Sequence, residues 1–118
     1  MAFLDELEGL GVDTREGLER VMGDESLYEM MFGIFLSTVE STPIALSEFD
    51  AGDLEELIAK VHSLKGTTGN LSITPLFTEY AEALNLLREN RPAEAQAVYA
   101  GLMPAQAAII DCIRRYQG

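Results

Sequence analysis

The sequence predicts an all-α fold, an up-down-up-down four-helix bundle with an additional short N-terminal helix across one end. Apolar side chains recur at alternating spacings of three and four residues in successive segments, which is typical of helices with one buried face. Cap residues, twice followed by proline, precede these segments. Nothing alternates with a period of two over a useful length, so we expect no strands. At 118 residues, the chain 1–118 is predicted to be a single domain.

The N-terminal part predicts two short helical stretches. Residues 2–10 are expected to make a short helical turn, within an extension formed by residues 1–11. Asp13 then has the position of an N-cap, with Glu16 at the capping-box position, and Gly23 ends the helix. The inward side chains of this helix are predicted to be Leu18, Val21 and Met22.

The next helix is predicted over residues 25–40, with Asp24 as its cap. Its apolar stripe is wider than one core face requires. Either the helix packs on two sides, or part of the stripe, such as Met31, Phe32 or Phe35, forms an exposed docking patch.

Proline marks the start of two further predicted helices, one before and one after residues 59–72. Thr42-Pro43 predicts a helix to about Phe49, or a bend in a longer helix. Thr74-Pro75 predicts a helix to about Glu89, with its inward side chains at Leu76, Phe77, Tyr80, Ala81, Leu84 and Leu87. The last segment, 92–116, keeps one apolar stripe through Pro104, which favours one kinked helix, with two helices as the alternative.

Residues 59–72 carry the candidate site, inside a helix that Asp53 is expected to cap, with Glu56 at the capping-box position. This stretch contains the only histidine, His62, and the only lysines, Lys60 and Lys65. At about 100° per residue, His62 lies roughly 130° from the centre of the buried stripe, so it should point outward. The stripe consists of Leu54, Leu57, Val61, Leu64, Thr68 and Leu71.

The neighbours of His62 on the same helix face favour a phosphoryl acceptor. Gly66 and Gly69 each cost a helix roughly 1 kcal/mol relative to alanine, and beside an outward histidine they would leave the ring accessible. Lys65, one turn on, can place a cation near an anion carried by the ring. Imidazole nitrogen is a good nucleophile near neutral pH.

The segment from His62 to Leu71 resembles the signature of the histidine-containing phosphotransfer (HPt) domain family. That pattern is His-x-Leu-Lys-Gly, then small residues, then an apolar position, and here it reads His-Ser-Leu-Lys-Gly-Thr-Thr-Gly-Asn-Leu. Asp13–Met22 looks like the family's first short helix, and Ala51-Gly52-Asp53 looks like its turn before the histidine helix. The resemblance covers roughly residues 12–116. The chain departs from the family at Ser72, where the family often has glycine, and Pro75 adds one residue to the following turn.

The resemblance implies a phosphorelay carrier rather than an enzyme with kinase activity of its own. His62 would accept a phosphoryl group from the aspartyl phosphate of a receiver domain in a hybrid sensor histidine kinase and pass it to the aspartate of a response regulator. No cofactor is expected, because Mg²⁺ would come with the receiver domain. A chain standing alone and a domain of a larger histidine kinase both fit the sequence.

Two further sets of residues complete the predicted site. Asn85 is expected level with His62 on the next helix, at about the place where related domains have a polar residue that contacts the active histidine. The alternative for Asn85 is an ordinary solvated side chain. The docking residues are predicted to be Ile58, Ala59, Met31 and Phe32.

Composition excludes several other classes of function. A net charge of −12 argues against nucleic acid and against an anionic membrane surface. The single Cys112 fits a reducing compartment, and the acidic N-terminus lacks the basic region of a signal peptide, so we expect a cytoplasmic protein. We also expect a monomer. A metal site is not expected, because there is no second histidine and Cys112 lies far from His62 along the chain.

Two other functions stay open as alternatives. One is a non-catalytic helical docking module whose histidine is unused. The other is a small hydrolase with His62 as general base, which has no support beyond isolated residues.

Overall fold

The computed structural model describes residues 2–50 and 53–117, and every regular element in these ranges is a helix, which confirms the all-α prediction. The elements are α1 (Ala2–Gly9), α2 (Thr14–Arg20), α3 (Glu25–Ser41), the short 3-10 helix η1 (Leu46–Asp50), α4 (Glu55–Asn70), α5 (Thr74–Arg88) and α6 (Pro92–Gln117). The turn expected at Ala51-Gly52 lies outside the described residues.

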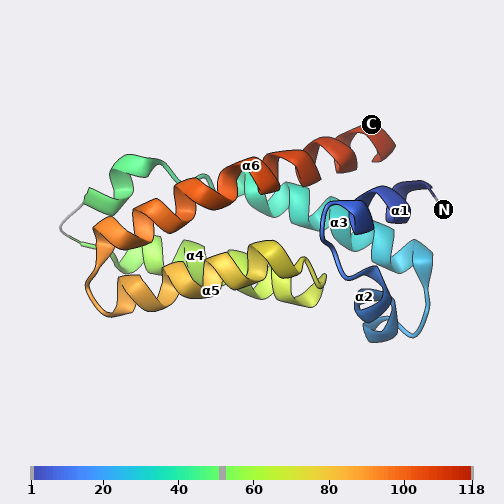
Figure 1. Cartoon of the computed structure of the whole chain (residues 1–118), viewed down its shortest axis with the longest axis horizontal. Coiled ribbons are helices and arrows are strands. Elements are labelled where there is room, and N and C mark those ends of the chain that lie inside the picture. The colour runs from blue at the N-terminus through green and yellow to red at the C-terminus, as the bar shows by residue number, and fades with distance from the viewer. Residues whose placement is uncertain (1, 51–52, 118) are drawn as a thin grey trace.

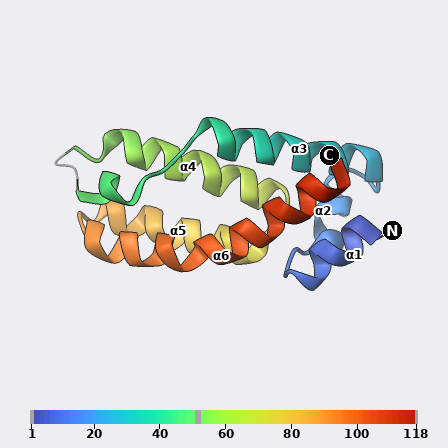
Figure 2. The same cartoon turned by 90° about the horizontal axis from the view of Figure 1, so that it is seen from above.

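The helices form an elongated molecule of 45 × 25 × 21 Å. At one end, α4 and α5 lie side by side, and α5 packs along the first part of α6 with η1 beside them (Figures 1 and 2). At the other end, α3 is displaced toward the later part of α6, where α1 and α2 also lie (Figures 1 and 2). The most extensive packing therefore involves α4, α5 and α6, whereas α3 overlaps α4 only over part of its length.

Apolar side chains from all these elements form one core. The largest fully buried side chains are Tyr28, Tyr80, Phe32, Phe35, Phe49, Leu7, Leu64, Leu71, Ile73, Leu76, Leu84 and Leu102. The predicted stripe of α4 points into this core at Leu57, Val61, Leu64 and Thr68. Because one face of α4 is committed to the core, its opposite face is free for other contacts.

Several expected helix ends lie one or more residues from where the sequence placed them. Asp13 and Asp24 do cap α2 and α3, since their carboxylates accept from the N–H groups of Glu16 and Leu27. At α4, the N-cap is Leu54 rather than the expected Asp53, although the Asp53 carboxylate accepts from the N–H of Glu55, the first helical residue. At α5, Thr74 is the first helical residue rather than the cap.

The helix predicted from Pro43 to Phe49 is wrong. Only Leu46–Asp50 is helical, as a short 3-10 turn. The preceding backbone is held by side chains instead: the N–H of Ala45 donates to Glu48, and Lys60 on α4 donates to the carbonyl of Pro43. One local side-chain contact and one contact from α4 thus replace the helical hydrogen bonds that the sequence pattern suggested.

Two side chains expected to face inward do not. Met22 is 95% exposed and has a positive φ of 57°, because the chain has already left α2 at Arg20. Phe77 is 37% exposed and covers the flank of α4 instead of entering the core. By contrast, α6 continues through Pro104 from Pro92 to Gln117, so the one-helix alternative is correct.

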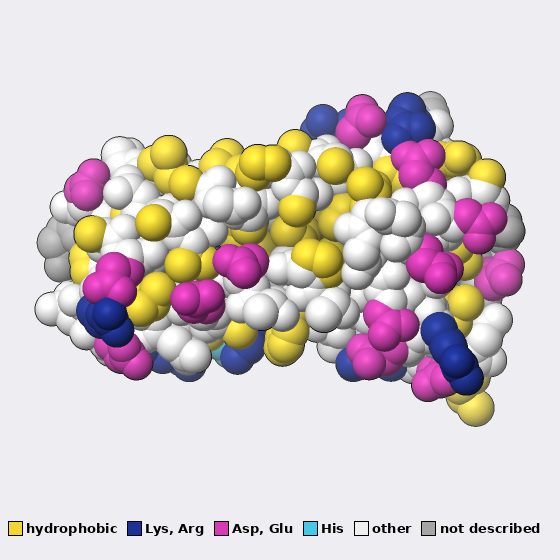
Figure 3. All heavy atoms as spheres, in the orientation of Figure 1, with side chains coloured by type: hydrophobic (Ala, Val, Ile, Leu, Met, Phe, Trp, Pro, Cys, Tyr) yellow, Lys and Arg dark blue, Asp and Glu magenta, His cyan; other side chains and the backbone are white. Residues whose placement is uncertain are grey.

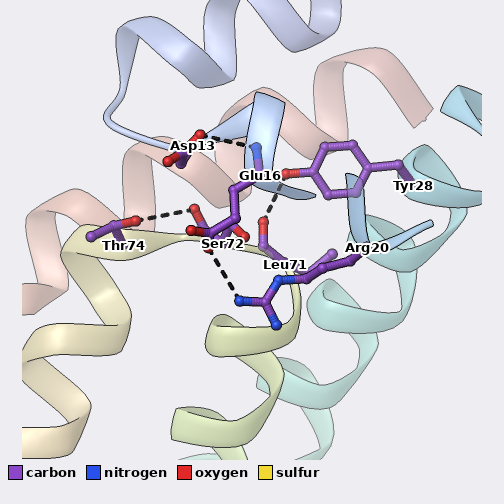
Figure 4. Close-up of polar contacts among 7 residues, drawn as sticks. All are labelled: Asp13, Glu16, Arg20, Tyr28, Leu71, Ser72 and Thr74. Atoms are coloured by element: carbon purple, nitrogen blue, oxygen red, sulfur yellow. Dashed lines mark hydrogen bonds and ion pairs between the residues drawn. The ribbon is translucent and has the colours of Figure 1, made fainter. Parts of the chain in front are cut away.

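A polar cluster fastens α2 and α3 to the α4–α5 turn (Figure 4). The buried hydroxyl of Tyr28 donates to the carbonyl of Leu71 at 2.7 Å, and the hydroxyl of Ser72 donates to Glu16 at 2.7 Å. Gly17 makes room for Tyr28, because a Cβ there would lie 2.1 Å from the phenol oxygen. This cluster fixes the end of α4 that carries the glycines.

The helix α1 is fastened to α6 by a second cluster. The Glu6 carboxylate pairs with Arg115, and it also contacts the buried thiol of Cys112. The Phe3 ring lies 5.3 Å from that of Tyr116. Burial and the hydrogen bond to Glu6 raise the pKa of the Cys112 thiol to about 11.

Candidate functional site

His62 lies in the middle of α4 and is exposed, on the face opposite the buried stripe. The space-filling view shows the histidine at the lower edge of the molecule, with Lys or Arg atoms on both sides of it (Figure 3). The expected outward orientation of His62 is therefore observed. Its accessibility follows from the helix period, because Val61 and Leu64 point into the core.

The two lysines of α4 have different surroundings. Lys60 turns away from His62 to the segment before α4, where its ammonium group donates to the carbonyl of Pro43 at 3.0 Å and to Glu48 at 2.7 Å. Lys65 is partly buried and forms no ion pair with any residue that the structure describes. Lys60 is thus a structural residue, whereas the charge of Lys65 remains available one turn from His62.

The two glycines also differ. A Cβ added at Gly66 would have no atom within 4 Å, so this position is open, as the sequence suggested. A Cβ added at Gly69 would lie 3.0 Å from two ring carbons of Phe77. Gly69 therefore leaves room for Phe77 of α5 beside α4, and its role in access to His62 stays a prediction.

The contact between Gly69 and Phe77 also gives the register of α4 against α5. A short turn joins these helices, so they run antiparallel. His62 precedes Gly69 by as many residues as Leu84 follows Phe77, and each residue advances a helix by about 1.5 Å. Since Leu84 is buried and Asn85 is exposed, Asn85 is the outward residue about level with His62.

This register agrees with the placement predicted for Asn85. Within the described part of the chain, the side chain of Asn85 forms no hydrogen bond to His62. The contact of Asn85 with the ring or with a phosphoryl oxygen stays a prediction.

The docking residues predicted from the sequence fall into three groups. Ala59 is exposed, and Ile58 is partly exposed while packing on the core, so both border His62 on α4. Met31 is half-buried on α3. Phe32 is fully buried, with its ring 5.7 Å from that of Phe3 and 4.9 Å from that of Tyr28, so its assignment to an exposed docking patch is wrong.

The exposed apolar side of α3 consists of residues that the sequence analysis did not select. Leu27, Met30 and Ile34 are 41%, 63% and 57% exposed. Their spacing of three and four residues marks a second stripe, which could have been separated from the buried stripe of Tyr28, Phe32 and Phe35. The helix therefore packs on one side and is exposed on the other.

A pocket of about 540 Å³ begins beside Gly66 and extends under α2. Gly66, Gly69 and Asn70 line it from α4, and Phe77 and Thr78 line it from α5. Glu16 and Arg20 close it from α2, where the carboxylate of Glu16 accepts from Arg20 at 3.2 Å. Sequence patterns within single helices carry no signal for such a pocket, because it forms only where three elements meet.

Ser72 and Arg20 stabilise the ionised form of Glu16 in this wall. The hydrogen bond from the Ser72 hydroxyl, followed by that from the Arg20 guanidinium, lowers the pKa of the Glu16 carboxyl. The Glu16 carboxylate therefore belongs to the polar cluster that holds the α4–α5 turn.

Comparisons of the chain with models of protein families, with curated proteins and with solved structures found no match. Among the described residues, no helix has the length and apolar character needed to cross a membrane. In the same ranges, no group of three or more His, Cys, Asp or Glu side chains is arranged to hold a metal ion.

Proposed function

We propose that the chain is a phosphorelay intermediate of the HPt type, in which His62 carries a phosphoryl group between receiver domains. The observation that carries this proposal is the exposed His62 on α4, with open space at Gly66 one turn on. Beside it lies Lys65, which has no ion pair among the described residues. The resemblance of the segment His62–Leu71 to the HPt signature supports the same function.

The transfer step on His62 is a displacement at phosphorus. The Nε2 lone pair of the neutral ring forms an N–P bond as the P–O bond to the partner's aspartate breaks. The aspartate leaves as a carboxylate, and the proton on Nδ1 stays on the ring. Reversal of this step on a second receiver passes the phosphoryl group on.

Each neighbour has a separate role in the proposal. Lys65 stabilises the phosphoryl charge, and the open position at Gly66 admits the receiver. Asn85 would contact the ring or a phosphoryl oxygen from α5. Docking would involve Ile58, Ala59 and Met31, joined by the exposed Met30 and Ile34 of α3.

The proposal includes the architecture and the setting expected from the sequence. Helices α3, α4, α5 and α6 would be the four helices of an up-down-up-down bundle, with α2 as the short helix across one end. The chain would act as a monomer in the cytoplasm, without kinase activity of its own. Any Mg²⁺ would be held by the partner's receiver domain.

The test is transfer of labelled phosphate from a phosphorylated receiver domain. The wild-type chain should become labelled, with an acid-labile and alkali-stable bond, and His62→Gln should not. Labelling of His62→Gln at the wild-type rate would show that another residue is the acceptor.

A second candidate function is a docking module whose histidine is unused. The exposed apolar side of α3, formed by Leu27, Met30 and Ile34, favours this alternative. In that case a receiver would leave the wild-type chain unlabelled, while Met30→Glu would weaken binding of the partner.

A further inference from the structure

We propose that Arg88, on α5, is a second anion-stabilising residue of the His62 site, so that Lys65 and Arg88 bracket the phosphoryl group. The proposal rests on the proposed function, because the anion concerned is the group that His62 would carry. Three independent observations support it.

The first observation is the pattern of ion pairs in an acidic chain. The chain has 8 Lys and Arg residues against 20 Asp and Glu residues. Within residues 2–50 and 53–117, carboxylates pair with Arg15, Arg20, Lys60, Arg91, Arg114 and Arg115. Lys65 and Arg88 are the two that have no such pair. Acids are in large excess, and yet these two cations have no carboxylate partner among the described residues. We take this as a sign that they are suited to bind an external anion.

The second observation is the register between α4 and α5. Arg88 follows Phe77 by about three helical turns, so it lies on the same flank of α5 as the ring that contacts Gly69. The residue equally far before Gly69 on α4 is Ile58, one turn before His62. Lys65 lies one turn after His62, and the two cations therefore stand on opposite sides of the ring along the helix axis.

The third observation is the surface itself. The space-filling view shows Lys or Arg atoms on both sides of the histidine (Figure 3). Arg88 is exposed in the last turn of α5, where its long side chain is free to turn toward an anion. Glu55 and Glu56, near the start of α4, are the acids of the histidine helix, and without opposing cations they would repel a phosphoryl dianion.

The inference is tested with a small donor, potassium phosphoramidate, which needs no receiver domain. The ring nitrogen of His62 displaces ammonia from phosphorus, so the P–N bond of the donor breaks as the new N–P bond forms. The rate of phosphohistidine formation and its lifetime are followed by ³¹P NMR in the wild type, Arg88→Gln, Arg88→Lys and Lys65→Gln. Arg15→Gln is the matched control, because it removes the same charge from the outer face of α2, where the side chain is 92% exposed.

We expect Arg88→Gln and Lys65→Gln each to slow phosphorylation or shorten the lifetime by roughly two- to fivefold at low salt. Arg88→Lys should keep most of the wild-type rate, and Arg15→Gln should match the wild type. The difference between Arg88→Gln and the wild type should shrink in about 1 M salt, where charges are screened beyond about 3 Å. A merely structural role of Arg88 would not produce this salt dependence.

Equal rates and lifetimes for Arg88→Gln and the wild type would overturn the inference, and so would equal losses in Arg88→Gln and Arg15→Gln. Absence of labelling in the wild type would also count against it, since a site with two free cations should accept this anionic donor. These outcomes differ from failure of the proposed function, in which receiver domains do not transfer to the chain although phosphoramidate still labels His62.

Discussion

Gly66 and Gly69 show how one residue type has two roles on the same helix face. A Cβ at Gly66 would face open space, whereas one at Gly69 would meet the Phe77 ring. In sequence they are indistinguishable, because both follow His62 at helical spacing. Only the position of α5 separates access from packing.

We predict opposite effects of alanine at these two positions. Gly66→Ala should raise the free energy of unfolding by up to about 1 kcal/mol, because it removes the helix cost of glycine without meeting a neighbour. Gly69→Ala should gain less or destabilise the chain, since its Cβ would lie 3.0 Å from the ring of Phe77. Denaturant unfolding measures both.

A control for the Gly69 effect is the double variant Gly69→Ala with Phe77→Ala. Without the Phe77 ring, alanine at position 69 should be stabilising. The double variant should therefore have a higher free energy of unfolding than Phe77→Ala alone. Equal stability changes at Gly66 and Gly69 would contradict the distinction.

At the residue scale, periodicity was sufficient for the orientation of His62 and for the buried stripe of α4. It failed for Phe32 on α3, because a wide apolar stripe does not tell which side meets the core. It also gave no sign that Lys60 pairs with Glu48, a contact that depends on how the chain returns to α4. Arg88 was not selected either, because its proposed role at His62 rests on the register of α4 against α5, which the sequence alone does not give.

The α4–α5 turn is held by elements that precede it in the chain. Tyr28 of α3 reaches the carbonyl of Leu71, and the N–H of Asp13 donates to the carbonyl of Ser72 at 2.9 Å. Ser72 has a positive φ of 58°, a conformation that a non-glycine residue adopts only at some cost. The polar cluster of α2 and α3 therefore stabilises the turn at the end of α4 that carries the glycines.

We predict that Tyr28→Phe lowers the free energy of unfolding by about 1–3 kcal/mol, because the buried Leu71 carbonyl loses its hydroxyl partner. Tyr116→Phe, at a side chain that is 46% exposed, is the matched control and should change stability by less than about 0.5 kcal/mol. Thermal or denaturant unfolding followed by circular dichroism provides both values. A Tyr28→Phe variant as stable as the control would show that water replaces the lost hydroxyl.

At the scale of elements, the sequence was informative where local signals agree with tertiary packing. The caps at Asp13 and Asp24 and the continuous α6 are examples. The segment 42–50 was not predictable in this way, because Lys60 of α4 holds it through the Pro43 carbonyl and the Glu48 carboxylate. The position of α3 along α6 could not be predicted either, because the hydrophobic period of a helix does not show where its partner helix lies along it.

Among the described residues, three of the carboxylates that join distant segments also have a lowered pKa. Glu6 joins α1 to α6 through Arg115, Glu16 joins α2 to the α4–α5 turn through Ser72, and Glu48 joins η1 to α4 through Lys60. In each case the hydrogen bond to that partner is the main cause that lowers the pKa of the carboxyl. The ionised forms of these acids therefore contribute to folding.

We predict a loss of stability in acid that depends on these carboxylates. A carboxyl whose pKa is lowered in the folded chain contributes stability above its ordinary value of 4.5, and this contribution disappears as pH falls through the lowered pKa. Glu16→Gln should therefore flatten the dependence of unfolding free energy on pH below about 5. Ser72→Ala should flatten it as well, since the Ser72 hydroxyl is the first cause of the shift at Glu16. If the slope of unfolding free energy against pH is unchanged in both variants, the contact between Glu16 and Ser72 does not make stability depend on pH.

Because Cys112 is buried where α1 packs on α6, the rate at which its thiol is labelled should report how often α1 detaches from α6. A thiol that is fully buried, and whose pKa is raised to about 11, should react with an aromatic disulfide reagent only when α1 lifts away. Glu6→Gln, which weakens the link to Arg115, should accelerate this labelling at pH 8, while unfolding of the remaining helices keeps its own rate. The single cysteine thus allows the fastening of the chain's two ends to be measured separately from the stability of the histidine helix.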